Sequence, residues 1–275
     1  MALKDILVVV DDSKAAAGRA AFAAGLAAHH DAHLTGLFVI APQEIPAYVM
    51  AQIPAEARRV QAKEGARKAA EARQTFEQAA DKAGFASRSE WLQEDGVPTE
   101  RTAMIGRYAD LIVAGQAEPE APASGRVEIA ELVLSGGRPV LVVPYAFRPQ
   151  RFGEHVLIAW NGSREAARAV ADAMPILEAA KRISVLAVDP PDMLGHEPGA
   201  DIARHIARHD VEVEVTHEVS HGLDPADALL NRVTDLSADM VVMGAYGRSR
   251  FSELVLGGVT RHILQHMTVP VLMSH

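Results

Sequence analysis

The strongest constraint on the fold is that the chain repeats itself. Four sequence blocks of the first half recur, in the same order, in the second half. The matching pairs are Lys4–Ser13 with Glu154–Ser163, Leu37–Ile40 with Leu186–Asp189, Ala109–Gly115 with Ala238–Gly244, and Arg138–Val142 with Val269–Met273. Self-similarity in a fixed order indicates repeated structural units. We therefore predict two tandem domains, residues 1–147 and 148–275, that meet in the polar, proline-containing stretch 145–153.

Each half alternates short apolar runs with longer Ala-rich segments. The apolar runs of the first half are Ile6–Val10, Leu34–Ile40, Leu111–Ala114 and Val140–Val143. Such near-continuous runs are typical of strands buried on both faces of a parallel sheet. Ala15–His30 and Arg164–Ala180 have a helical pattern. Ser13 and Ser163 stand where helix N-caps belong. The alternation predicts α/β architecture, with two tandem doubly wound, Rossmann-like domains.

Composition excludes several classes of function. The 275 residues carry a formal net charge of −9, which argues against binding to nucleic acid or to an anionic membrane surface. No apolar run approaches the roughly 20 residues of a membrane-spanning helix. Cysteine is absent, so disulfides, cysteine nucleophiles and thiolate metal sites are excluded. With no recognisable export signal, we expect a cytoplasmic protein.

The segment 42–82 is much longer than its counterpart in the second half, which runs from about Pro190 to His209. It begins with three prolines and continues as an Ala-rich, charged stretch in which Glu64 and Lys68 form an i,i+4 pair. This pattern is typical of a long solvated surface helix. An arm that docks a partner is the alternative interpretation.

The stretch from Gly244 to Thr260 is the most informative candidate site. It follows a predicted strand and precedes a predicted helix, Val259–His266. Glycines at a strand end allow close approach of a ligand to the backbone, and a helix that begins after Gly257-Gly258 offers free N–H groups to an anion. Arg248 adds positive charge. The alternative is an ordinary Gly-rich turn, since glycine spacing alone is a weak signal.

The spacing G-x2-G-x9-G at Gly244, Gly247 and Gly257 resembles the nucleotide loop of the universal stress protein family. The strand ends Val10–Ser13 and Trp160–Ser163 also resemble the family's first strand and the turn that follows it. The resemblance covers nearly the whole chain as two copies. It implies a five-stranded parallel sheet of order 3-2-1-4-5 in each copy, adenine-nucleotide binding in some members, and dimers formed through the last strand.

The resemblance assigns a set of residues in the second half to ATP. The set is Asn161, Val188, Gly244, Gly247, Arg248, Gly257, Gly258, Val259 and Thr260. Two of them depart from the family pattern. Gly258 stands where a Ser or Thr hydroxyl usually meets the phosphates, and Asn161 replaces the Asp near the sugar. Asn can still hydrogen-bond a ribose, although without charge.

The first half retains less of this pattern. Asp11 is present, but no second glycine follows Gly115 at the required spacing. Glu118 and Glu120 would repel phosphate at short range. We therefore expect the first half to be free of ligand, or to bind something other than a triphosphate.

A competing motif is His217-Glu218-Val219-Ser220-His221, which matches the H-E-x-x-H pattern of zinc proteases. Zinc binding requires the two histidines to lie one helical turn apart. Here apolar residues alternate with polar ones from Val211 onward, which predicts a strand in which residues four apart are separated by about 13 Å. No catalytic or metal site is therefore assigned.

Three functions follow from these patterns. The first is a stress-response module that binds ATP through its second domain as a sensor or regulator. The alternatives are a ligand-free interaction scaffold and, third, a slow ATP hydrolase, for which no general base is identifiable. Each half ends in an apolar strand that would lie at a sheet edge, and bare edges are prone to pairing. We expect the two last strands to pair within one chain, with a homodimer of chains optional.

Overall fold

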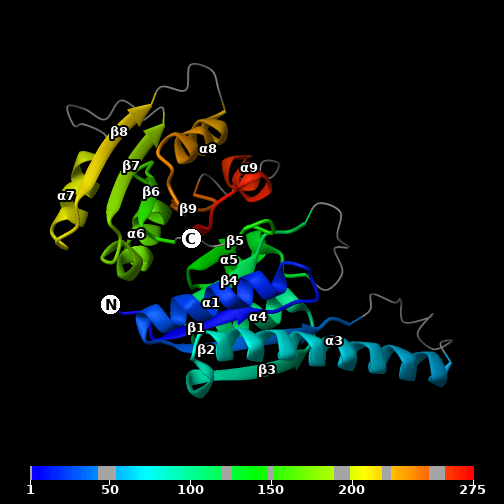
Figure 1. Cartoon of the computed structure of the whole chain (residues 1–275). Helices are drawn as coiled ribbons and strands as arrows, with labels where there is room; N and C mark the ends of the chain where they lie inside the picture. The colour runs from blue at the N-terminus through cyan, green and yellow to red at the C-terminus, as the bar shows by residue number, and fades with distance from the viewer. Residues whose placement is uncertain are drawn as a thin grey trace. The chain divides into compact units, whose positions relative to one another are not determined.

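A computed structural model describes residues 2–42, 54–118, 126–147, 152–188, 199–218, 224–247 and 258–275 (Figure 1). The chain divides into two compact units, residues 3–132 and 133–275. Among the described residues, no helix is both long enough and apolar enough to cross a membrane.

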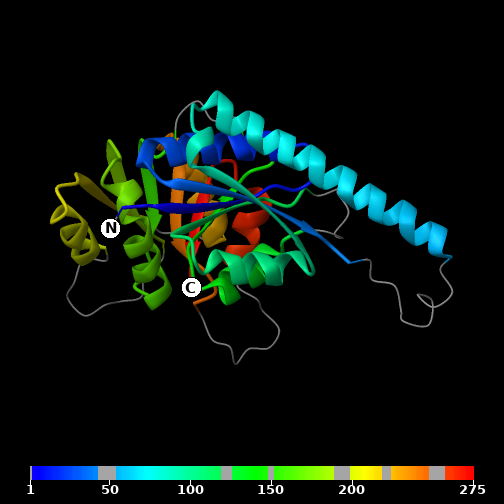
Figure 2. The same ribbon diagram turned by 90° about the horizontal axis from the view of Figure 1, so that it is seen from below.

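The unit 3–132 is built on four parallel strands in the order β3-β2-β1-β4. Its elements are β1 (Asp5–Val9), α1 (Ala16–His30), β2 (His33–Ile40), α3 (Ala55–Lys82), the 3-10 turn η1 (Ala86–Arg88), β3 (Ser89–Asp95), α4 (Pro98–Gly106) and β4 (Leu111–Gly115). Helix α5 (Ile129–Gly136) spans the unit boundary. Helices α1 and α3 pack together on one face of the sheet, and α4 covers the other (Figure 2).

The unit 133–275 contains β5 (Val140–Val143) and the whole second repeat. The elements of that repeat are β6 (His155–Ala159), α6 (Arg164–Leu177), β7 (Arg182–Val188), α7 (Ala200–Ala207), β8 (Val213–Glu218), α8 (Pro225–Asp235), β9 (Met240–Gly244), α9 (Gly258–His266) and β10 (Val271–Ser274). Its parallel strands run in the order β8-β7-β6-β9-β10, which is the predicted order 3-2-1-4-5. On its other side β10 pairs with β5 in antiparallel register, with Leu272 opposite Leu141.

The predicted strands owe their burial to their apolar sequences. All four residues of β5 and of β10 are buried, as are four of the five residues in β4 and β9. Strands enclosed on both faces need no polar alternation, which is why short aliphatic runs were sufficient to predict them. Strand β8 includes His217 and Glu218. The strand prediction for the H-E-x-x-H motif is therefore confirmed over Val213–Glu218, whereas His221 lies outside the described residues.

Helix α3 confirms the predicted long helix but not its predicted ion pair. Glu64 pairs with Arg67, and Lys68 instead reaches Asp12 beyond the end of β1, with 2.7 Å between Nζ and Oδ2. Because α3 packs against α1 and β2, Lys68 lies close to Asp12 in the turn that follows β1. The helix extends beyond the sheet at its N-terminal end (Figure 2).

The repeated Ala-Asp blocks have a structural role. Asp110, just before β4, accepts hydrogen bonds from the backbone N–H groups of Lys4 and Asp5 at 2.7 and 3.1 Å. In the second repeat, the carboxylate of Asp239 accepts the equivalent bonds from Glu154 and His155 at 3.0 and 3.2 Å. Each aspartate thus binds the backbone N–H groups at the amino end of its repeat's first strand.

Candidate functional site

The candidate site lies at the carboxyl ends of β6 and β9, which are adjacent because Ala159 stands opposite Met243 in the parallel ladder. Ligands bind at this edge of open α/β sheets. Asn161 follows β6 and Gly244 ends β9. Gly247 lies close to the turn after β6, because a Cβ added to it would meet Ser163 Oγ at 3.5 Å. The segments after the two strands therefore meet at one place.

Asn161 and Ser163 form the first side of the site. The Asn161 Oδ1 accepts a hydrogen bond from the Ser163 N–H at 3.1 Å. The Ser163 Oγ in turn accepts from the Ala166 N–H at 3.1 Å, which confirms Ser163 as the N-cap of α6. Because Ser163 satisfies this N–H, that donor at the start of α6 is not available to a ligand.

The prediction that Ser13 caps a helix is wrong. In the first repeat the Ser13 hydroxyl donates to Asp11 Oδ1, which also accepts the Ser13 N–H. Helix α1 then begins only at Ala16, with Ala15 as its cap residue and no side-chain cap. In the second repeat, Asn161 Oδ1 accepts the Ser163 N–H and the Ser163 hydroxyl accepts the Ala166 N–H.

The strand-end glycines make close contacts of two different kinds. A Cβ on Gly244 would collide with the backbone of Glu165 and Ala166, so the first turn of α6 packs directly on this strand end. A Cβ on Gly115 would instead collide with the guanidinium of Arg19. Gly244 therefore has a packing role, independent of any ligand.

Arg19 fills the strand-end space of the first repeat. Its side chain is buried, its Nε donates to the Val9 carbonyl at 2.8 Å, and its Nη2 lies 2.8 Å from Asp11 Oδ1. Burial raises the pKa of Asp11, but the charge of Arg19 and the hydrogen bonds from Ser13 outweigh it, so that pKa lies below its usual value. Asp11 is thus an ionised carboxylate with a partner from its own chain.

Glu165 is the residue of the second site that sequence reasoning missed. Its side chain is buried, and a Cβ on Gly247 would meet its Oε2 at 2.6 Å. Burial raises the pKa of Glu165, but hydrogen bonds that include one from Arg164 bring that pKa below its ordinary value. A negative charge therefore lies next to Gly247. An acidic residue in a first helical turn is common, so the sequence carried no signal for this burial.

Tyr246, between the two site glycines, adopts a left-handed backbone conformation with φ of 59°. Non-glycine residues rarely occupy this region, and such residues cluster at functional sites. Burial raises the pKa of the Tyr246 hydroxyl, and the charge of Arg261 offsets part of that effect.

The remaining predicted residues fall into two groups. Gly258, Val259 and Thr260 form the first turn of α9, where Gly258 and Val259 are exposed and Thr260 is buried. Val188 is the last residue of β7. Arg248 and Gly257 lie outside the described residues, as do Glu120 of the first half and most of the loop that joins β9 to α9. Among the described residues, no three His, Asp or Glu side chains are grouped so as to hold a metal ion.

Comparisons with known proteins support two copies of one domain in this chain. The chain is similar to a universal stress protein from Archaeoglobus fulgidus DSM 4304, with 18% identity, a TM-score of 0.75, and coverage of 98% of this chain and 96% of that one. It is also similar to a functionally unknown protein from Pseudomonas aeruginosa PAO1, with 16% identity, a TM-score of 0.57, and coverage of 99% and 92%. No curated protein matches at a significant level.

The model of the universal stress protein family matches the chain twice, over residues 2–143 and 153–275. The two matched segments coincide with the two sequence repeats and together cover almost the whole chain. The chain therefore belongs to the universal stress protein family, as a tandem member with two copies of the family's domain.

Proposed function

We propose that this stress-response protein is a regulatory module that binds an adenine nucleotide, ATP, through its second repeat, residues 148–275. The observation that carries the proposal is the meeting of Gly247 with the turn after β6, which places Asn161 and the segment after β9 at one strand-end edge. The exposed first turn of α9, at Gly258 and Val259, adds a helix N-terminus that suits phosphate.

The first repeat is proposed to be free of nucleotide. A ribose needs a polar group at the end of the first strand, but Asp11 is already paired with Arg19 and already accepts hydrogen bonds from Ser13. The equivalent of Arg19 in the second repeat is Ala169, which carries no charge. The side chain that occupies the strand-end acceptor in the first repeat, Arg19, is therefore missing from the second repeat, where Asn161 is available to a ligand.

Glu165 favours the second candidate function, a ligand-free interaction scaffold. Its carboxylate lies next to Gly247, and an ionised carboxylate repels phosphate in a poorly solvated site. The two departures at Gly258 and Asn161 point the same way. The two candidates thus make opposite predictions for a direct binding measurement.

Calorimetric titration of the full chain with ATP tests the proposal. The Asn161→Asp variant keeps the acceptor for the Ser163 N–H and restores a charged partner for ribose, so it should bind ATP several-fold more tightly than the parent. The matched variant Asp11→Asn changes the same position of the first repeat and should leave the affinity unchanged. No heat of binding in either the parent or Asn161→Asp would favour the scaffold. A change confined to Asp11→Asn would place the site in the wrong repeat.

We further propose that the functional domains are residues 1–147 and 148–275. We also propose that the protein is cytoplasmic. The antiparallel pairing of β10 with β5 supports a junction in which the last strands of the two repeats cover each other's edges. One chain would then be equivalent to a dimer of single-domain members, and a homodimer of chains would be optional.

A further inference from the structure

Helix α4 of the unit 3–132 buries mostly small residues and turns large apolar ones to solvent. Its buried residues are Pro98, Thr99, Thr102, Ala103 and Gly106. On the opposite face, Val97 at the N-cap is 45% exposed, Met104 is 51% exposed and Tyr108, just after the helix, is 87% exposed. A surface helix normally has the reverse pattern, with its apolar stripe facing the core. The outer face of α4 is therefore an unusual apolar surface.

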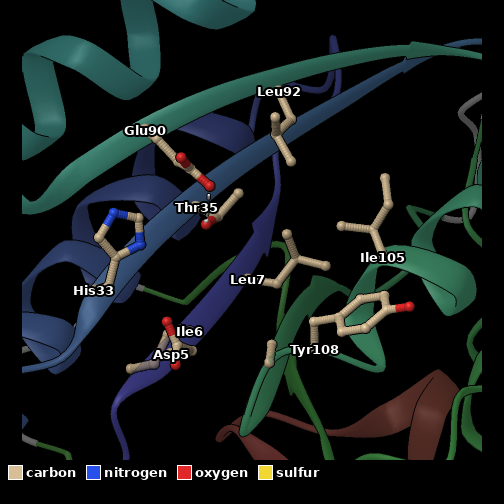
Figure 3. Close-up of a pocket in the computed structure, with 10 residues that line it drawn as sticks. Asp5, Ile6, Leu7, His33, Thr35, Glu90, Leu92, Ile105 and Tyr108 are labelled. Atoms are coloured by element: carbon tan, nitrogen blue, oxygen red, sulfur yellow. Dashed lines mark hydrogen bonds between the residues drawn. The ribbon is translucent and has the colours of Figure 1, made fainter.

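Val97, Met104 and Tyr108 form one continuous stripe, which we call the α4 stripe. They are seven and four residues apart, so they lie within about 40° of one line along a helix. The Tyr108 N–H donates to the Ile105 carbonyl at 3.1 Å, which continues the turn to Tyr108. Figure 3 shows the Tyr108 ring beside Ile105 at the end of α4. Single exposed apolar side chains are ordinary, whereas a contiguous group marks an interaction surface.

The second repeat shows that the fold does not need apolar residues at these positions. Its equivalent helix is α8, because α4 begins at Pro98, α8 begins at Pro225, and each precedes an Ala-Asp pair. Counted from these prolines and from the Ala-Asp pairs, the three positions of the α4 stripe correspond to Asp224, Asn231 and Ser237, which are all exposed. The α4 stripe is therefore a property of the first repeat, with no role in building the domain.

The area of the α4 stripe suits a weak and reversible interface. An aromatic side chain alone presents about 150–250 Å², so the exposed parts of the three side chains amount to roughly 400 Å² on each chain. Two stripes in contact would bury roughly 800 Å², and interfaces below about 1,200 Å² are typical of transient complexes.

The charges beside the α4 stripe are complementary to themselves. Glu100 and Arg107 lie on the same flank of the stripe, toward its opposite ends. In an antiparallel pair of helices related by a two-fold axis, equal flanks face each other, so Glu100 of each copy meets Arg107 of the other. In the same arrangement the small Val97 of each copy faces the large Tyr108 of the other, and Met104 lies near the axis.

We propose that the α4 stripe docks a second copy of this chain, as an antiparallel and two-fold symmetric pair of α4 helices. A copy of the chain already carries the matching charges and apolar groups, whereas another protein would have to supply both. This interface is separate from the pairing of β5 with β10, which lies within one chain. It also leaves the strand-end site of the second repeat out of the contact.

Sedimentation equilibrium of the full chain tests the proposal. Between about 5 and 500 µM, a reversible monomer–dimer equilibrium should appear, with a dissociation constant of about 100 µM for an interface of this area. A chain that stays monomeric over this range would overturn the proposal. The runs contain no ATP, so their result is independent of the nucleotide proposal.

Variants locate the interface. Met104→Lys places a charge near the two-fold axis and should weaken the dimer at least about tenfold, which corresponds to about 1.4 kcal/mol. Because Met104 is exposed, circular dichroism should show an unchanged fold. The matched control is Val60→Lys, which makes the same change at an exposed apolar position of α3 and should leave the dimer unaltered. Equal weakening by both variants, or no weakening by Met104→Lys, would overturn the proposal.

A charge swap tests the antiparallel arrangement. Glu100→Arg brings like charges together at both ends of the interface and should weaken the dimer about threefold. The double variant Glu100→Arg, Arg107→Glu exchanges the two charges and should restore the association of the parent. Weakening without restoration would contradict the antiparallel pair.

Discussion

The guanidinium of Arg19 and the carboxylate of Asp11 form an ion pair of 2.8 Å in which the arginine is 3% exposed and the aspartate 28%. Removal of a buried partner leaves the other charge uncompensated. Arg19→Ala should therefore destabilise the unit 3–132 by about 2–3 kcal/mol, between the values for exposed and buried pairs. Urea unfolding followed by Trp91 fluorescence, in a Trp160→Phe background, measures the change.

A double-mutant cycle separates the ion pair from the lost packing of Arg19. Asp11→Ala combined with Arg19→Ala should cost less than the sum of the two single changes, because neither charge is left alone. Additive costs would show that Arg19 acts only by filling the space beside Gly115.

The lowered pKa of Asp11 predicts a specific pH dependence. A carboxyl group with a folded-state pKa below its unfolded value contributes stability at pH values above about 4, and that stability is lost as the pH falls through the folded-state value. Trp91-detected unfolding from pH 5 to pH 2.5 should show this loss. In Arg19→Ala the burial of Asp11 dominates, so the same decline should become smaller or disappear. An unchanged decline would assign it to other carboxylates.

The two repeated serines should respond differently to the same substitution. Ser163→Ala removes the cap of α6 and should cost about 1 kcal/mol, measured by unfolding with Trp160 as the probe. Ser13→Ala removes a hydroxyl that donates to Asp11 and caps no helix N–H, so α1 should keep its helical start. Hydrogen exchange at the first amides of each helix provides the readout. Equal loss of protection in both helices would contradict the difference between Asp11 and Asn161.

A charge placed in the antiparallel ladder tests the role of β5. Leu272 and Leu141 stand opposite each other and are both fully buried. Leu272→Lys and Leu141→Lys should therefore each destabilise the unit 133–275 by several kcal/mol. The informative variant is Leu141→Lys, because Leu141 belongs to the first repeat in sequence while Trp160 belongs to the second. Leu134→Lys, at an exposed apolar position, is the control. If Leu141→Lys leaves the unfolding monitored at Trp160 unchanged, β5 is dispensable for the stability of the second repeat.

Much of the fold was predictable because it depends on local pattern. Short aliphatic runs identified β4, β5, β9 and β10, since a strand covered on both faces has no need of polar positions. The helical pattern of α3 was equally plain. Its ion pair was not, because Lys68 had a neighbour in sequence, Glu64, and a better-placed partner in space, Asp12.

The site was predictable only in outline. The glycine spacing identified which strand ends matter, but it did not show that Gly244 contacts the backbone of α6 or that Gly115 contacts Arg19. Both contacts depend on tertiary packing, because the backbone of Glu165 and Ala166 faces one strand end and the side chain of Arg19 faces the other. Burial of Glu165 likewise follows from tertiary packing and has no signature in the sequence.

The aspartates that precede β4 and β9 have a consequence for how the chain is made. Asp110 holds the start of a strand that left the ribosome about a hundred residues earlier, and Asp239 does the same for His155. Contacts of such long sequence separation form slowly, because a large loop must close first. The first strand of each repeat can therefore pair early with the strand that follows it, but its other edge and its amino end gain their partners only after the fourth strand has been made.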